Sequence, residues 1–157
     1  MNTLSVPQVY SENQLFAQGV QAGEFTFLAQ DARGADGSVG EFHSAWQQAQ
    51  RILSNLDAAL LSTGQSLENP VSLSVFLPDY SDSEAVTNVL RSTFTTTGAA
   101  INIIGVCALE GNCRVRMDAL ASTNHDRETI AVAGVPPVDG LELPCRAGRR
   151  FRVSLRH

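Results

Sequence analysis

The chain has 157 residues, of which 43% are hydrophobic and 17% are charged, and this composition predicts one folded domain and excludes wholesale disorder. Its net charge of −5 argues against a nucleic-acid partner, because such partners are held by basic side chains that neutralise phosphates. All eleven basic residues are arginines, so Schiff-base or P-loop chemistry on a lysine of this chain is excluded.

The sequence predicts a cytoplasmic protein without a membrane span, a metal or a cofactor. No apolar stretch approaches the roughly 20 residues that cross a bilayer, and the first twenty residues lack the basic and apolar regions of a signal peptide. Three cysteines, an odd number without a secretion signal, are expected to be reduced thiols. None of the three histidines pairs with a cysteine or an acidic residue at a spacing typical of a zinc site.

Composition divides the chain into three parts: an N-terminal arm over residues 1–13, a folded domain over 14–122, and an extension over 123–157. The arm is polar and is expected to be loose. The extension contains Pro136 and Pro137, and its last twelve residues hold five of the eleven arginines. It is either a solvated basic tail or a segment that lies on the acidic body.

The folded domain is expected to open with a hairpin and a long helix. Apolar runs over residues 15–20 and 24–30 are split by Gln21-Ala22-Gly23, a pattern typical of two paired strands. After a loop rich in glycine and aspartate, apolar residues recur at steps of three and four. This period predicts an amphipathic helix over residues 38–62, ended by Thr63-Gly64, with Trp46 in the core.

The second half of the domain is expected to contain three strands and one helix. Residues 70–77 alternate between apolar and small polar side chains, as a half-buried strand does. A helix follows over residues 81–96, opened by a capping box between Ser81 and Glu84. Strands are predicted over residues 100–109 and 114–121. The order β-β-α-β-α-β-β predicts an α+β fold with two helices on one face of a mixed sheet.

One layer of helices leaves the second face of such a sheet uncovered. That face is expected to carry apolar or small residues of the fourth strand. They are Ile101, Ile103, Gly105, Cys107 and Leu109. Either loops and the extension cover this face, or copies of the chain pack their faces together in an oligomer, which is the interpretation we favour.

Several segments, in this order and spacing, match one known family. They are Gln18-Gly19-Val20 with Ala22-Gly23 and the apolar run 25–29, Leu53 to Leu60 with Thr63-Gly64, Val71 to Asp79, Val86-Thr87-Asn88, and Arg116 to Ala121. Together they resemble the RidA family, also called YjgF, the reactive-intermediate deaminases. The resemblance covers about residues 14–122, which is nearly the whole predicted domain.

The resemblance implies a chorismate-mutase-like α+β fold and a homotrimer whose sheets pack around the threefold axis. It also implies ligand sites in the three clefts between subunits. Typical members hydrolyse enamines and imines released by pyridoxal-phosphate enzymes, giving a keto acid and ammonia. Because one fold hosts many activities, the residues of the site decide whether this activity is expected here.

The family's functional residues are replaced at the matching positions. The arginine that holds the substrate carboxylate stands in a Pro-Ala-Arg segment, where this chain has Ala99-Ala100-Ile101. In the Glu-x-Glu-Ala strand, Arg116 replaces the water-activating glutamate and Asp118 stands at the second acid. The remaining replacements are Phe16 for a tyrosine near the first strand, and Ala29 and Gln30 for a small hydroxyl residue and a glycine.

These replacements change the chemistry that the site can perform. Arg116 is always protonated and cannot act as a base, so it either anchors an anion or pairs with Asp118 or a neighbouring subunit's acid. Asp118 is the one carboxylate available as a base, and an adjacent guanidinium makes it a weak one. Phe16, Ile101 and Ile103 either line an apolar pocket or pack in the core, and Asn102 either caps its strand or points into the cleft.

The sequence therefore predicts a diverged RidA-like trimer that binds a small, anionic, partly apolar metabolite between its subunits. The predicted ligand-binding residues are Arg116, Phe16, Ala29, Gln30, Ile101, Asn102 and Ile103. Two alternatives stay open. One is an enamine or imine deaminase with altered chemistry that uses Asp118 or an ordered water. The other is a structural or regulatory trimer whose basic extension contacts an acidic partner.

Overall fold

The computed structural model describes residues 2–4, 18–95, 98–124 and 126. Its regular elements are β1 (Asn2–Leu4), β2 (Gly19–Ala22), β3 (Phe25–Asp31), α1 (Ala45–Leu61), β4 (Pro70–Leu77), a 3-10 turn (Tyr80–Asp82), α2 (Ser83–Thr93), β5 (Ala100–Gly105) and β6 (Arg116–Ser122). The chain divides into two units, residues 1–127 and 128–157, and the second unit lies outside the described residues.

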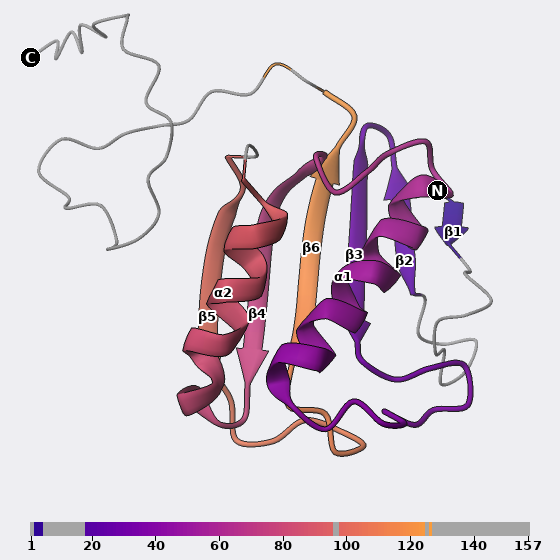
Figure 1. Ribbon diagram of the computed structural model, residues 1–157. Helices are drawn as coiled ribbons and strands as arrows, with labels where there is room; N and C mark the ends of the chain where they lie inside the picture. The colour runs from indigo at the N-terminus through magenta and orange to yellow at the C-terminus, as the bar shows by residue number, and fades with distance from the viewer. Residues whose placement is uncertain (1, 5–17, 96–97, 125, 127–157) are drawn as a thin grey trace, which may run out of the picture. The chain divides into compact units, whose positions relative to one another are not determined.

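The strands form one mixed sheet in the order β1-β2-β3-β6-β4-β5. Only β4 and β5 run parallel, and the other neighbours are antiparallel. Helices α1 and α2 lie side by side on the same face of the sheet (Figure 1). The predicted α+β fold with two helices on one face of a mixed sheet is confirmed.

The core lies between the helices and the sheet. Its largest fully buried apolar side chains come from both helices and from alternate positions of the central strands. They are Ile52, Leu56, Leu60, Leu73, Leu77, Met117, Val75, Val86 and Val115, each under 2% exposed. Burying one such side chain stabilises the fold by about 1.5–3 kcal/mol, which makes this layer the main source of stability.

Helix α1 begins at Ala45, seven residues later than the periodic pattern predicts. Ser44 stops the helix there through a capping box, in which its hydroxyl accepts from the Gln47 amide and the Gln47 side chain accepts from the Ser44 amide. The prediction that Trp46 lies in the core is wrong, because its side chain is 48% exposed. The apolar stripe of the helix runs instead through Ala49 and Ile52.

Helix α2 begins two residues later than predicted, and the capping box between Ser81 and Glu84 is not formed. Asp79 supplies the cap of the preceding 3-10 turn, since its Oδ1 accepts hydrogen bonds from the amide and the hydroxyl of Ser81. The hydroxyl of Ser81 is therefore already used as a donor. Among the described residues the helix ends at Thr93, short of the predicted end at 96.

Several strand boundaries differ from their predictions, and β2 runs through Gln21 and Ala22, which were expected in the turn. β1 lies within the arm expected to be loose, where its backbone pairs with β2. β5 ends at Gly105, four residues early, and β6 begins at Arg116, two residues late. The first hairpin is confirmed for its described residues, with Gly23 in the left-handed conformation that its turn requires, at a φ of 60°.

Candidate functional site

The face of the sheet opposite the helices, here called the outer face, is formed by every second residue of four strands. Along β3 and β6 exposed positions alternate with buried ones, as expected for a strand with one covered face. The outer-face residues are Phe25, Phe27, Ala29 and Asp31 of β3, Arg116, Asp118 and Leu120 of β6, Ser72, Ser74 and Phe76 of β4, and Ala100, Asn102 and Ile104 of β5.

The strand register arranges these residues in rows across the sheet. One row is small and polar, and it consists of Ala29, Asp118, Ser74 and Asn102. The next row towards the start of β6 consists of Asp31, Arg116, Phe76 and Ile104. A guanidinium and two apolar side chains therefore stand beside a row of hydrogen-bonding groups.

Arg116 and Asp118 form an ion pair within one chain. Arg116 Nε donates to Asp118 Oδ1 at 3.2 Å, and the two side chains are 46% and 42% exposed. Such a half-exposed pair stabilises a fold by less than about 1 kcal/mol. Within the described part of the chain, no hydrogen bond is made by the two terminal nitrogens of Arg116. The pairing expected as one alternative is thus formed, and it leaves donors on the guanidinium.

Asp31 stands opposite Arg116 in the register but is held by another arginine. Arg33 donates to Asp31 Oδ2 from Nη2 at 2.6 Å and from Nε at 2.9 Å. Arg33 Nη1 also lies 3.7 Å from Glu110 Oε2. Since Asp31 is already neutralised, it does not compete with an anion for Arg116.

The structure brings some of the predicted site residues together and separates others. Ala29 and Asn102 lie on the outer face in the row of Asp118. Gln30 points to the helix side, where it is buried and donates from Nε2 to the Gln18 carbonyl at 3.0 Å. Asn102 is exposed in the middle of β5, so the strand-capping alternative is wrong.

Ile101 and Ile103 pack against the buried cluster on the helix side of the sheet. The prediction that they belong to the uncovered face is wrong, because the side chains of β5 alternate and Asn102 occupies that face. Phe16 lies outside the described residues.

Sequence reasoning missed the contribution of β4 to the site. Ser74 and Phe76 stand next to Asp118 and Arg116, and Ile104 follows them on β5. The alternation of β4 was visible in the sequence and marked Ser74 as facing away from the core. The cross-strand neighbours were not visible, since they depend on the register between distant segments.

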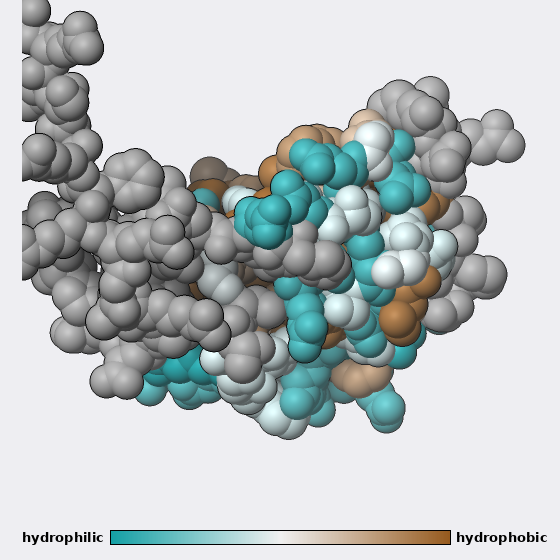
Figure 2. All heavy atoms as spheres, turned by 90° about the horizontal axis from the view of Figure 1, so that it is seen from above, coloured by the Kyte–Doolittle hydropathy of each residue, from teal (hydrophilic) through white to brown (hydrophobic). Residues whose placement is uncertain are grey.

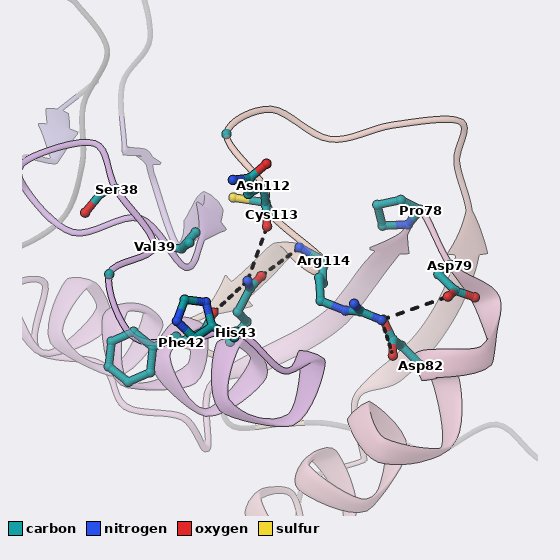
Figure 3. A pocket seen from close by; sticks show the side chains of 13 residues that line it. Ser38, Val39, Phe42, His43, Pro78, Asp79, Asp82, Asn112, Cys113 and Arg114 are labelled. Atoms are coloured by element: carbon teal, nitrogen blue, oxygen red, sulfur yellow. Dashed lines mark hydrogen bonds and ion pairs between the residues drawn. The ribbon is translucent and has the colours of Figure 1, made fainter.

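A concave feature lies at the end of the sheet where β4 ends and β6 begins. This feature, here called the loop cleft, is shown in Figure 3. Its volume is about 810 Å³. Its walls are the segment before α1, the loop after β4 and the loop before β6. It is lined by Ser38, Val39, Gly40, Phe42, His43, Gln48, Pro78, Asp79, Asp82, Gly111, Asn112, Cys113 and Arg114.

The loop cleft contains a thiol that is not activated. Burial raises the pKa of the Cys113 thiol above its ordinary value, and the nearby charge of Asp31 raises it further. Cys113 is therefore protonated at neutral pH. In the described part of the chain, no group of three or more His, Cys, Asp or Glu side chains is arranged to hold a metal ion.

The end of the sheet that carries the β2–β3 turn is seen from above in Figure 2. Seen from that end, the described surface is a mosaic of hydrophilic and hydrophobic residues (Figure 2). The strongly exposed aromatic and aliphatic side chains of the sheet are Phe27 at 51%, Ile104 at 40% and Phe25 at 39%, and all three belong to the outer face. No described helix is both long and apolar enough to cross a bilayer.

Comparison with known proteins identifies the family. The sequence model described as endoribonuclease L-PSP matches residues 9–123, which is more than half of the chain. The chain belongs to the RidA/YjgF family. The boundaries of the match agree with the segments that carried the sequence resemblance.

Two relatives illustrate the range of names within this family. The protein DfrA of Myxococcus xanthus is 32% identical over 110 residues, which cover 68% of this chain and 83% of that protein. A protein of Dermatophagoides farinae named 2-iminobutanoate/2-iminopropanoate deaminase is 23% identical over 109 residues, which cover 67% of this chain and 83% of that protein.

Solved RidA-type structures share the fold. Yeast Mmf1 has a TM-score of 0.72 and 23% identity, and the match covers 77% of this chain and 97% of Mmf1. The Escherichia coli protein TdcF, solved with bound serine, has a TM-score of 0.70 and 19% identity, with 79% of this chain and all of TdcF covered. These likenesses establish the fold alone.

Proposed function

We propose that this chain binds a small, anionic, partly apolar metabolite on its outer face, where copies of the chain meet, and that it lacks the usual imine hydrolysis. The half-exposed guanidinium of Arg116, with donors left over beside an apolar pair, carries this proposal. Two parallel N–H groups of a guanidinium match the two oxygens of a carboxylate.

The neighbours of Arg116 suit the rest of such a ligand. Phe76 and Ile104 stand in the same row and offer an apolar surface, of which Ile104 is 40% exposed. Ser74 and Asn102 stand one row further and offer hydroxyl and amide groups. A short carboxylate with a hydrocarbon body therefore finds a partner for each of its parts.

The same arrangement is poorly suited to hydrolysis of an imine. Hydrolysis adds water across the C=N bond, so it needs a base to take a proton from the water and an acid to protonate the departing nitrogen. Asp118 already accepts a hydrogen bond from Arg116, and its own row contains no second acid. Proton transfer at this site would rest on a single carboxylate.

We include self-association in the proposal, as a homotrimer with the outer faces turned inwards. Three large apolar side chains on one face are costly to leave in water, and a copy of the same face covers them. A partner copy would also enclose the ligand. The two rows of side chains on a single sheet are open to solvent and do not enclose it. Family membership and the shared fold support this assembly.

The ribonuclease activity in the family's description forms no part of the proposal. The chain has a net charge of −5, which opposes binding of a polyanion. A second candidate is supported by the name of the Dermatophagoides relative. In that case 2-iminobutanoate and water would give 2-oxobutanoate and ammonia, with Asp118 or an ordered water moving the proton.

Calorimetric titration with 2-oxobutanoate tests the binding proposal. The variant R116A is expected to bind at least tenfold more weakly than the parent chain. The matched control is R91A, an exposed arginine on α2 that makes the same change in net charge on the other side of the sheet. Equal affinity of R116A and the parent would remove Arg116 as the anchor.

A coupled assay separates binding from catalysis. Threonine dehydratase generates 2-iminobutanoate in solution, and the release of ammonia is followed with and without the chain. The proposal expects the spontaneous rate. A rate well above it that falls in a D118N variant would establish the deaminase candidate and overturn the proposed loss of hydrolysis. Sedimentation analysis of the same samples reports the assembly, and a monomer at all concentrations would refute the trimer.

A further inference from the structure

The loop cleft plays no part in the proposed function, since none of its lining residues belongs to the outer face. Its volume of about 810 Å³ lies within the range of small-molecule sites, which is about 300–1,000 Å³. Segments far apart in the sequence meet in it: residues 38–43, 78–82 and 111–114. The cleft therefore exists only in the folded chain.

Gln48 holds two walls of the loop cleft in place. Its side chain is 1% exposed and reaches from α1 into the gap between the loops. Oε1 accepts from the Arg114 amide at 2.7 Å, while Nε2 donates to the Phe42 carbonyl at 2.9 Å. A longer bond of 3.4 Å joins Nε2 to the Asn112 carbonyl. The walls are thus fixed before any ligand arrives, which lowers the entropy cost of binding.

The charges in the cleft leave one carboxylate over. Arg114 forms a bidentate pair with Asp82, with Nε to Oδ2 at 2.9 Å and Nη2 to Oδ1 at 3.0 Å. Asp79 Oδ2 forms a longer ion pair with Arg114 Nη2, at 3.9 Å, which is beyond hydrogen-bond length, so one arginine serves both aspartates. Two aspartates and one arginine give the lining a formal charge of −1 when His43 is neutral.

The leftover carboxylate stays ionised. Hydrogen bonds from the hydroxyl and the amide of Ser81 lower the pKa of Asp79 below its ordinary value, and the charge of Arg114 acts in the same direction. Both bonds are made to Oδ1, at 2.7 Å and 3.0 Å. Oδ2 is therefore the oxygen available to a ligand, and the carboxylate is 61% exposed.

On the side away from Asp79 the lining combines apolar side chains with Ser38 and His43. Val39 and Phe42 stand on one wall, and Pro78 stands between them and the acidic end (Figure 3). One face of the Phe42 ring makes a cation–π contact with Arg51, whose guanidinium carbon lies 5.7 Å from the ring centre. An apolar ligand body is left with Pro78 and Val39 as its contacts.

We propose that the loop cleft is a binding site for a small organic cation, namely a primary ammonium on a short hydrocarbon chain. The ammonium donates to Asp79 Oδ2, and the hydrocarbon lies against Pro78 and Val39. Charge complementarity selects this occupant, since the only cation of the lining that is permanently charged is already paired with Asp82. An anion would meet the net negative charge of the lining instead.

Butylammonium chloride, titrated into the full chain, tests this site. Amide NMR spectra are expected to shift at Val39, Phe42 and Asn112, and butyrate at the same concentrations is expected to leave those resonances in place. The variant D79N keeps an oxygen for the Ser81 hydrogen bonds and removes only the charge, so it is expected to bind butylammonium at least tenfold more weakly.

The matched control is D36N. Asp36 accepts the same pair of hydrogen bonds from the serine two residues on, at 3.0 Å and 2.9 Å, yet it does not line the cleft. The affinity of D36N for butylammonium is expected to equal that of the parent chain. The site is refuted if butylammonium shifts no resonance of the cleft, if D79N binds as tightly as D36N, or if butyrate binds equally well.

Discussion

Replacing Gln48 with methionine should cost this fold about 2–3 kcal/mol. The Arg114 amide and the Phe42 carbonyl both lose their partner, and an unsatisfied polar group costs about 1–3 kcal/mol when buried. The cost of each lost hydrogen bond is expected at the lower end of this range, because water in the loop cleft can reach the two unpaired backbone groups. The bond of 3.4 Å to Asn112 adds little. Methionine preserves length and helix propensity, so the hydrogen bonds are the main difference.

Urea denaturation followed by circular dichroism measures this cost. The same substitution at Gln50, an exposed neighbour on α1, is the control and is expected to change stability by less than about 0.5 kcal/mol. All samples are compared at one protein concentration, because assembly would raise the apparent stability. If Q48M and Q50M unfold at the same urea midpoint with the same slope, the bridging role of Gln48 is refuted.

Three further predictions concern the scaffold. S44A removes the cap of α1 and should lower stability by about 1 kcal/mol in thermal unfolding. G19A places a Cβ only 2.4 Å from a methyl of Leu28 and should cost about 1–3 kcal/mol, which an unchanged melting temperature would refute. The pKa values of Asp36 and Asp79 are lower in the folded chain than in the unfolded chain. Both carboxylates therefore stabilise the fold above pH 3.8, and this contribution is lost as the pH falls through their folded pKa values. A D36N/D79N chain should accordingly lose less stability on acidification than the parent.

The order of elements could be predicted because each one buries a single stripe. The alternation over residues 70–77 predicted β4 with its correct bounds. Along β6, Met117 and Arg116 were correctly assigned to opposite faces of the strand. Helix starts were predicted poorly. The apolar periodicity begins before the helix and includes Phe42, but the capping hydrogen bonds of Ser44 set the true start of α1. Sequence spacing alone does not show which of several possible capping residues forms these bonds.

The site was predicted in part for a related reason. Arg116 and Asp118 share a strand, so their common face followed from the sequence. Ile101 was matched to a family position by spacing along the chain, and spacing does not state which face of β5 that position occupies. The loop cleft was not foreseen at all, since Gln48, Asp79 and Arg114 meet only through tertiary packing.

The orientation of β5 can be tested by placing an arginine at two adjacent positions. I101R puts a charge among partly buried apolar side chains and should cost at least about 2 kcal/mol in urea denaturation. N102R puts the same charge on the outer face, next to Ser74 and in the row of Asp118, and should cost less than I101R when both are compared at one protein concentration. The reverse ranking of the two stabilities would mean that the two faces of β5 are exchanged, and the outer face described for this strand would be wrong.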